Sequence, residues 1–354
     1  MISRAMLATI FLALAPGTRC RLDSDQRVVE IPPAAKVSDA TNCKDVSDSR
    51  TCASWAGKDL SGCLLSPGHM ALNCPRTCKM CHLRSASARC GPLQNDNVAM
   101  RHGDMSRLFS NLTATPRLEI AQDGSSSEVP GEFIWTGRNE RPYVVHLLSS
   151  NPWIVQVDNV LSDYEADEII GIAHNTGFTC STTTGEVDNT GTINRKKDMD
   201  RTSQQAWCQG SCDDEELINT LYDRIHEITT VPPSNYEHLQ MLKYEEGQKY
   251  NAHHDLLGLD PIVSACGPRI LTFFVYLSEV EEGGETSFTE LGINVVPRKG
   301  SALLWTNVPV DDYDGIESKT MHAALPVKKG RKYAANAWIH LKDYRYVNLW
   351  ACSG

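Results

Sequence analysis

The sequence has little positive charge and almost no long hydrophobic run. It holds 34 lysine and arginine residues against 44 aspartate and glutamate residues, for a net charge of −10 at pH 7. Nucleic-acid binding normally needs a basic face that replaces phosphate counterions, so this balance argues against a nucleic-acid partner. Beyond residue 18 no apolar stretch has the length of a membrane-spanning helix. What remains is a chain of 354 residues, long enough to bury a sizeable core.

The N-terminus carries the one hydrophobic run. Residues 5–15 are apolar, follow Arg4 and end at a Pro-Gly pair. This pattern predicts a signal peptide or signal anchor over residues 1–18, followed by a polar linker over residues 19–42. The sequon that starts at Asn111 fits a glycoprotein of the secretory pathway. Because the closing string WACSG is no KDEL-type signal, residence in the endoplasmic reticulum or Golgi lumen and secretion both stay open.

Thirteen cysteines suit an oxidising compartment, and six of them fall between residues 43 and 81. A segment this short cannot hold itself together by apolar burial, so we expect a disulfide-rich module there. A zinc site at Cys74, Cys78 and Cys81 is the alternative interpretation.

The spacing of these cysteines, with the closing string NCPRTCKMC, resembles the ShK toxin-type domain. Channel-blocking members of that family carry a Lys-Tyr pair before the fourth cysteine, and the interval LLSPGHMALN has neither residue, which favours a docking or spacer role with an unknown partner. The resemblance implies the disulfide pairs Cys43–Cys81, Cys52–Cys74 and Cys63–Cys78.

The remainder of the chain predicts one α+β domain over residues 151–345. Residues 82–150 are of mixed composition and indicate a linker that merges into the domain edge, and residues 346–354 a C-terminal tail. Ser162 and Glu165 form a capping box before a first helix, and a second helix is expected over residues 213–229. Short β-type runs follow from residue 238 to 341, which predicts a sandwich or small barrel. The polar stretch 181–203 is typical of a binding lid.

The string YEEGQKYNAHHDLL carries the chemistry. His253 and Asp255 are two residues apart at a strand end, so both side chains point to one face. With His322 from another strand they would form a facial triad, which leaves coordination positions open for a bidentate cosubstrate and dioxygen. Lys332 follows His322 by ten residues across a turn centred on Gly330, and a hairpin would bring the two side by side.

Residues 152–342 resemble the catalytic domain of collagen-type and plant-type prolyl 4-hydroxylases. The resemblance is carried, in family order, by the strings VDNVLSDYEADEII, RTS, LKYEEGQKYNAHHD, YLSEVEEGGETSF, KGSALLW and HAALPVKKGRKYAANAWIH. It implies a double-stranded β-helix (jelly-roll) core with flanking helices. It also implies Fe(II), with 2-oxoglutarate and dioxygen as cosubstrates, ascorbate as a further requirement, and a proline-rich or collagen-like polypeptide as substrate.

The same resemblance implies roles for individual residues. His253, Asp255 and His322 would bind iron, and Lys332 would pair with the distal carboxylate of 2-oxoglutarate. Tyr244 and Thr286 would donate hydrogen bonds to that cosubstrate, while the positions near the peptide groove are Arg201, Arg269 and Trp338.

Two alternatives stay open. The same parts serve other 2-oxoglutarate dioxygenases such as lysyl hydroxylases, and the domain could be a non-catalytic scaffold in a secreted binding protein. His254 and His340 are interpreted as structural. Cys208 and Cys212 are close enough to pair locally, and domain disulfides are possible at Cys180, Cys266 and Cys352.

Overall fold

The computed structural model describes residues 43–93, 97–121, 125–138, 140–188, 190, 192–197, 199–256 and 264–353. The predicted signal segment and the linker that follows it lie outside these residues. Within the described part of the chain, no helix combines the length and apolar character needed to cross a bilayer.

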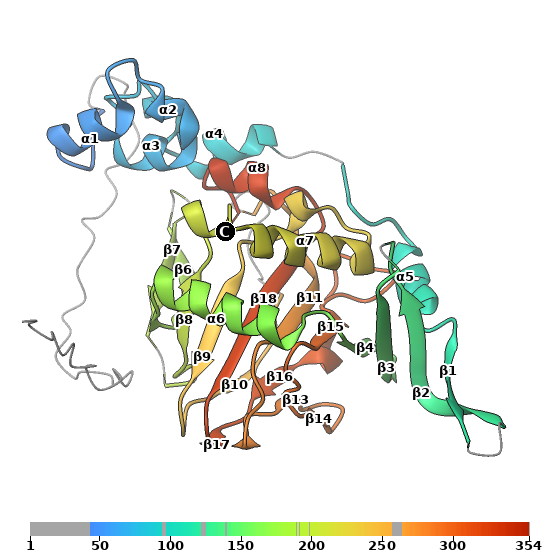
Figure 1. Ribbon diagram of the computed structural model, residues 1–354. Helices are drawn as coiled ribbons and strands as arrows, with labels where there is room; N and C mark the ends of the chain where they lie inside the picture. Colours follow the sequence, from blue (N-terminus) through green and yellow to red (C-terminus); the bar gives the residue numbers. More distant parts are fainter. Residues whose placement is uncertain are drawn as a thin grey trace, which may run out of the picture.

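A ten-stranded sheet forms the centre of the molecule (Figure 1). Its strand order is β1-β2-β3-β4-β15-β11-β18-β9-β8-β5, and all neighbours run antiparallel. β11 and β18 are buried on both faces, which explains their nearly continuous apolar sequences. The strands from the middle of the sheet to its far edge are β4 (Trp153–Asp158), β15 (Ala302–Thr306), β11 (Arg269–Tyr276), β18 (Lys332–His340), β9 (Gln240–Tyr244), β8 (Gln204–Trp207) and β5 (Thr179–Cys180).

Two helices, α6 (Asp163–Thr176) and α7 (Glu216–Thr229), lie across one face of this sheet (Figure 1). The predicted capping box of α6 is confirmed, since the Ser162 and Glu165 side chains each accept from the other's backbone N–H. α7 begins three residues later than predicted, and a 3₁₀ turn (Gly210–Cys212) next to the Cys208–Cys212 disulfide precedes it. The apolar sides of both helices join the main core against the sheet.

A smaller sheet covers the opposite side and has the order β10-β16-β13-β14. The core between the two sheets holds Phe274, Tyr276, Phe288 and Trp305. This two-sheet sandwich is the architecture that the strand pattern predicts. The strands of the small sheet are β10 (Tyr250–His253), β16 (His322–Ala324), β13 (Thr286–Phe288) and β14 (Ile293–Val295), and two further pairs are β12 (Glu282–Gly283) with β17 (Val327–Lys329) and β6 (Thr183–Val187) with β7 (Ile193–Lys196).

Residues 82–150 were predicted as a linker that merges into the domain edge, and the structure has the edge begin far earlier than a linker would allow. Three strands of this segment extend the large sheet beyond β4. Tyr143 and Val145 in β3 are buried while the positions beside them are more exposed, a period of two that the surrounding serine and glycine residues obscure in the sequence. The elements are α4 (Ala86–Cys90), α5 (Asp104–Leu112), β1 (Pro116–Ile120), β2 (Ser126–Thr136) and β3 (Pro142–Ser150).

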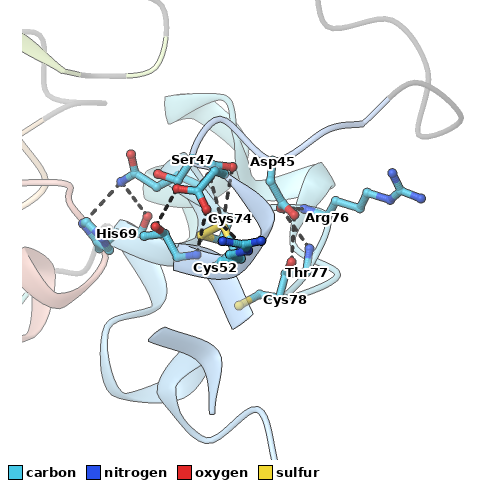
Figure 2. Close-up of a disulfide and its surroundings, with 12 residues drawn as sticks. Asp45, Ser47, Cys52, His69, Cys74, Arg76, Thr77 and Cys78 are labelled. Carbon is cyan, nitrogen blue, oxygen red and sulfur yellow. Dashed lines mark hydrogen bonds between the residues drawn. A yellow bond between two sulfur atoms is a disulfide. The ribbon is translucent and has the colours of Figure 1, made fainter. Parts of the chain in front are cut away.

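Residues 43–81 form a separate cysteine-rich module of three short helices, α1 (Ser49–Ala56), α2 (Gly62–Leu65) and α3 (Pro67–Asn73). Its disulfides are the pairs that the toxin-type resemblance implies, and they leave no thiolate for the alternative zinc site. Figure 2 shows the surroundings of one of them, where Asp45 accepts hydrogen bonds from the backbone amides of Arg76 and Thr77. These contacts bring the two ends of the module together.

The other cysteines correct one expectation. Cys352 pairs with Cys90, and Cys208 with Cys212, while Cys180 is also disulfide-bonded. Cys266 is a buried free thiol and forms none of the domain disulfides considered for it. The predicted C-terminal tail contains most of helix α8 (Tyr344–Leu349), and short 3₁₀ turns occur at Cys81–Leu83, Gly91–Leu93, Gly210–Cys212, Pro233–Asn235 and Ser318–Thr320.

Candidate metal centre and cosubstrate cavity

Strand pairing brings the three predicted metal ligands together. β10 runs antiparallel to β16 with His253 opposite His322, and Asp255 follows two residues after His253. One ligand atom from each side chain lies within 4.8 Å of the others. The Asp255 carboxylate is 3.7 Å from Nε2 of His253 through Oδ1 and 3.6 Å from Nε2 of His322 through Oδ2. The predicted convergence is confirmed.

Backbone carbonyls select the tautomer that a metal site needs. Nδ1 of His253 lies 2.9 Å from the carbonyl oxygen of Asn251, and Nδ1 of His322 lies 2.9 Å from that of Thr320. A carbonyl can only accept, so each Nδ1 carries the proton and each Nε2 presents its lone pair to the shared centre. Burial, reinforced by the neighbouring imidazole of His322, lowers the pKa of His253 to about 3 and keeps this ring neutral.

Asp255 is held by residues that sequence reasoning missed. Thr272 Oγ1 donates to Asp255 Oδ2 at 2.8 Å, and Asn307 Nδ2 donates to Thr272 Oγ1 at 2.8 Å. Burial of the Asp255 carboxyl raises its pKa, but the histidines and Arg269 outweigh this effect and lower the pKa to about 2. The only signal for Thr272 in the sequence is a polar residue inside the apolar run RILTFFVY.

A cavity opens beside the triad, between the two sheets. Tyr244 and Thr286, the two predicted cosubstrate donors, both line it. Tyr276, which the sequence analysis did not identify, donates its hydroxyl proton to Thr286 Oγ1 at 2.7 Å. The lining residues are Leu242, Tyr244, Tyr250, His253, Asp255, Phe274, Thr286, Trp305, His322, Ala323, Ala324 and Asn336.

Lys332 is fully buried next to this cavity. Its Nζ donates to the Gly284 carbonyl at 2.8 Å and approaches Thr286 Oγ1 at 3.5 Å. Burial lowers the pKa of Lys332 to about 7, an effect that the charge of Glu285 opposes. Among the described residues, no carboxylate forms an ion pair with this ammonium. A buried cation of this kind fits an anionic ligand at the end of the cavity. The rings around Nζ, with centroids at 5.3 to 5.6 Å, belong to Tyr244, Phe274 and Tyr276.

The hairpin expected to join His322 to Lys332 is absent from this described region. His322 begins β16 in the small sheet, whereas Lys332 begins β18 in the large sheet opposite Tyr244. The intervening β17 leaves both and pairs with β12. His322 and Lys332 therefore serve one cavity because the two sheets face each other.

The three predicted peptide-groove residues surround the triad without lining the cavity. Arg269 is buried, forms an ion pair with Glu237 at 2.5 Å and lies over the Trp338 ring at 3.9 Å. The Arg201 guanidinium lies 4.6 Å from the centre of the Tyr250 ring, which stacks on His253. Their role in substrate binding stays a prediction.

Two other histidines have structural partners, in line with their interpretation. His254 Nε2 lies 2.9 Å from the Glu317 carbonyl oxygen, and its Nδ1 accepts from the Leu256 amide at 3.0 Å. His340 is buried, with Nε2 2.9 Å from Glu237 Oε1. Neither ring points to the shared centre of the triad.

Comparisons with known proteins agree with this chemistry. Residues 239–340 match the family model of the 2OG-Fe(II) oxygenase superfamily. Prolyl 4-hydroxylase 2 of Arabidopsis thaliana is 30% identical over 224 residues, which cover 57% of this chain and 72% of that protein. Probable prolyl 4-hydroxylase 8 of the same plant is 36% identical over 149 residues. That alignment covers 37% of this chain and 51% of the plant protein, so the chain spans about half the length of this relative.

Among solved structures, the viral collagen prolyl hydroxylase of Paramecium Bursaria Chlorella virus-1 in its 2OG complex is 28% identical. That alignment covers 55% of this chain and 98% of the viral chain, with a TM-score of 0.43. The family-model match over residues 239–340 spans the three metal ligands and Lys332. The chain therefore belongs to the prolyl 4-hydroxylase family of 2OG-Fe(II) oxygenases.

Proposed function

We propose that this protein hydroxylates peptidyl proline to 4-hydroxyproline, using Fe(II), 2-oxoglutarate and dioxygen and releasing succinate and carbon dioxide. The observation that carries the proposal is the convergence of His253, Asp255 and His322 beside a cavity. The Lys332 ammonium is buried next to this cavity, in contact with the lining residue Thr286, and forms no ion pair with a described carboxylate. A facial triad leaves three positions of an octahedral ion open. The family resemblance supplies the jelly-roll description of the two sheets and the choice of proline.

The side chains of the site have distinct tasks in this reaction. The two imidazole Nε2 atoms and the Asp255 carboxylate would hold the ferrous ion, and Lys332 with Thr286 would hold the distal carboxylate of 2-oxoglutarate. The bound iron and cosubstrate supply the oxidising power for replacing a C–H bond by C–OH. The buried walls of the cavity, such as Phe274 and Trp305, keep water away from the reacting atoms.

We propose a proline-rich or collagen-like segment as the substrate, because a polyproline II strand has little conformational entropy left to lose on binding. Arg201, Arg269 and Trp338 would border the groove that receives it. We also propose ascorbate as a reductant and the endoplasmic reticulum or Golgi lumen as the site of action, with secretion as the alternative. The disulfides support an oxidising compartment.

We propose a docking or spacer role for the cysteine-rich module, in the sense of the ShK-type domain that its cysteine spacing resembles. Its three disulfides support a rigid unit of this type. Asn111, at the exposed end of α5, supports the proposed glycosylation.

The test is a mass-spectrometric assay of the full chain with Fe(II), 2-oxoglutarate, ascorbate and either proline-rich or lysine-bearing peptides. The expected result is a gain of one oxygen on proline together with stoichiometric succinate. Hydroxylation confined to lysine would replace the proposal with a lysyl hydroxylase. A lack of both peptide oxidation and 2-oxoglutarate turnover would instead favour the non-catalytic scaffold.

A further inference from the structure

Arg89 is a buried cation that lies outside the catalytic site. Its guanidinium donates hydrogen bonds to backbone carbonyl oxygens. Its side chain belongs to a residue that is only 2% exposed. Nε donates to the Trp350 carbonyl at 2.7 Å, and Nη1 donates to the carbonyls of Leu83 and Arg84, each at 3.0 Å. Nη2 donates to the carbonyls of Thr190 at 2.6 Å and Ala351 at 3.2 Å.

These bonds use all five N–H groups of the guanidinium, and each goes to a different carbonyl oxygen. The acceptors come from three parts of the chain: the residues after the cysteine-rich module, the C-terminal segment after α8, and the tip of the β6–β7 hairpin. A planar fork with five donors suits five such acceptors, whereas a lysine ammonium has three donors and would leave at least two of them without a partner.

Asp188 lies at the tip of the β6–β7 hairpin, next to Thr190, whose carbonyl contacts Arg89. The Asp188 carboxylate accepts hydrogen bonds from the backbone amides of Thr190 at 2.8 Å and Thr192 at 3.0 Å. The charge of Asp188 also favours the protonated guanidinium, against the burial that lowers the Arg89 pKa. Thr190 therefore contacts Asp188 through its amide and Arg89 through its carbonyl.

The base of the same hairpin lies beside the metal ligands. Arg201 Nη1 donates to the Thr182 carbonyl at 3.3 Å, and its guanidinium lies over Tyr250, which stacks on His253 with ring centroids 3.6 Å apart. The Asn251 amide donates to the Asp200 carbonyl at 2.8 Å, so the chain that leaves the hairpin runs along β10. The hairpin is therefore anchored at the rim of the cavity by Arg201 and at its tip by Arg89.

The other side of the Arg89 anchor is rigid. The adjacent Cys90 is disulfide-bonded to Cys352, which ties α4 to the C-terminal segment. Helix α3 of the module packs on this segment so closely that a Cβ added to Gly68 would lie 2.1 Å from the carbonyl carbon of Trp350. In Figure 1 the module and α4 lie at the same end of the molecule as α8.

We propose that Arg89 is a positioning residue for the hydroxylation reaction, which fixes the β6–β7 hairpin in the orientation that receives the polypeptide and couples it to the cysteine-rich module. The substrate class rests on the proposed function. The anchor itself rests only on the five hydrogen bonds and the disulfide.

The experiment compares Arg89→Ala, Arg89→Lys and the control Arg50→Ala in the full chain. Arg50 is exposed on α1 of the module, so its removal tests for a general effect of losing a cation there. Hydrogen exchange is measured on the amides of β6 and β7, together with the KM for a proline-rich peptide and the rate of peptide-independent 2-oxoglutarate turnover. Losing a pre-ordered binding element should raise the peptide KM about tenfold.

The expected result is faster exchange in β6 and β7 and a higher peptide KM for Arg89→Ala, with 2-oxoglutarate turnover and the Arg50→Ala control unchanged. Arg89→Lys should show the same changes in smaller measure, which keeps the test valid if the alanine variant does not fold. Unchanged exchange in the lysine variant and in a folded alanine variant would overturn the proposal. If wild type oxidises no peptide, the proposed function fails, while hydrogen exchange still decides the anchor.

Discussion

Replacing Lys332 with methionine should weaken cosubstrate binding and, at the same time, raise the free energy of unfolding of the ligand-free protein. The ammonium is fully buried and forms no ion pair with a described carboxylate, so it is an electrostatic cost until an anion arrives. Removing one partner of a buried, hydrogen-bonded charge pair costs roughly 2–5 kcal/mol, which corresponds to a loss of about 30-fold or more in 2-oxoglutarate affinity. Methionine fills a similar volume without a charge to desolvate, so the free energy of unfolding without ligand should rise.

The pH dependence of stability follows from the same burial. The pKa of Lys332 is about 7 in the folded protein against an ordinary value of 10.5, so the unfolded chain binds more protons between these pH values. The contribution of Lys332 to the free energy of unfolding therefore rises with pH from about pH 7 to pH 10.5, and it does not change with pH below this window. In that window 2-oxoglutarate binding must take up a proton, and its affinity falls as the pH rises.

The assay is isothermal titration of the iron-loaded protein with 2-oxoglutarate under nitrogen, with melting curves of the ligand-free protein from pH 6 to 10. Lys329→Met is the matched control, since Lys329 is exposed and paired with Glu281. The Lys332→Met variant should bind weakly, melt higher and lose the rise of stability with pH. Wild-type affinity in this variant, or a lower melting temperature at pH 6, would refute the reasoning.

Three further predictions concern the metal and the disulfide frame. Asp255→Asn or His253→Ala should abolish iron binding, read by metal analysis after gel filtration, with an unchanged far-UV circular dichroism spectrum; full iron content in either variant would contradict the ligand assignment. Thr272→Val removes the hydrogen bond that orients Asp255, and iron affinity should fall about 10- to 100-fold, measured by competition with a chelator; an unchanged affinity would show that the bond is dispensable. The double change Cys90→Ser and Cys352→Ser opens a link between residues 262 apart in sequence. By chain entropy it should cost roughly 5–6 kcal/mol in urea unfolding, and a loss below 1 kcal/mol would argue against that origin.

The metal triad could be predicted because it depends on short-range geometry. His253 and Asp255 are two residues apart on a strand, and only one partner from another strand had to be found. The α6 capping box is local in the same way. Thr272 and Asn307 could not be found by this reasoning, because they reach Asp255 only through the register of β11 in the large sheet.

Long-range pairings set the other limit of prediction. The link between Cys90 and Cys352 has no signal in the local spacing of the cysteines, and Cys266 offered an equally plausible partner. β1 and the first half of β2 were missed because these exposed strands carry few apolar residues. The prediction of a hairpin around Gly330 was wrong because β17 pairs with β12, and this pairing depends on the arrangement of the two sheets.

The Cys90–Cys352 disulfide joins the C-terminal segment covalently to a part of the chain that precedes the catalytic domain. A protease that clips between α8 and Cys352 would leave the last residues covalently held by Cys90 while detaching them from α8. The carbonyls of Trp350 and Ala351 would then no longer be supported by α8, and Arg89 would lose the fixed acceptors of two of its five donors. Cleavage after α8 would in this way release one anchor of the β6–β7 hairpin without touching His253, Asp255 or His322.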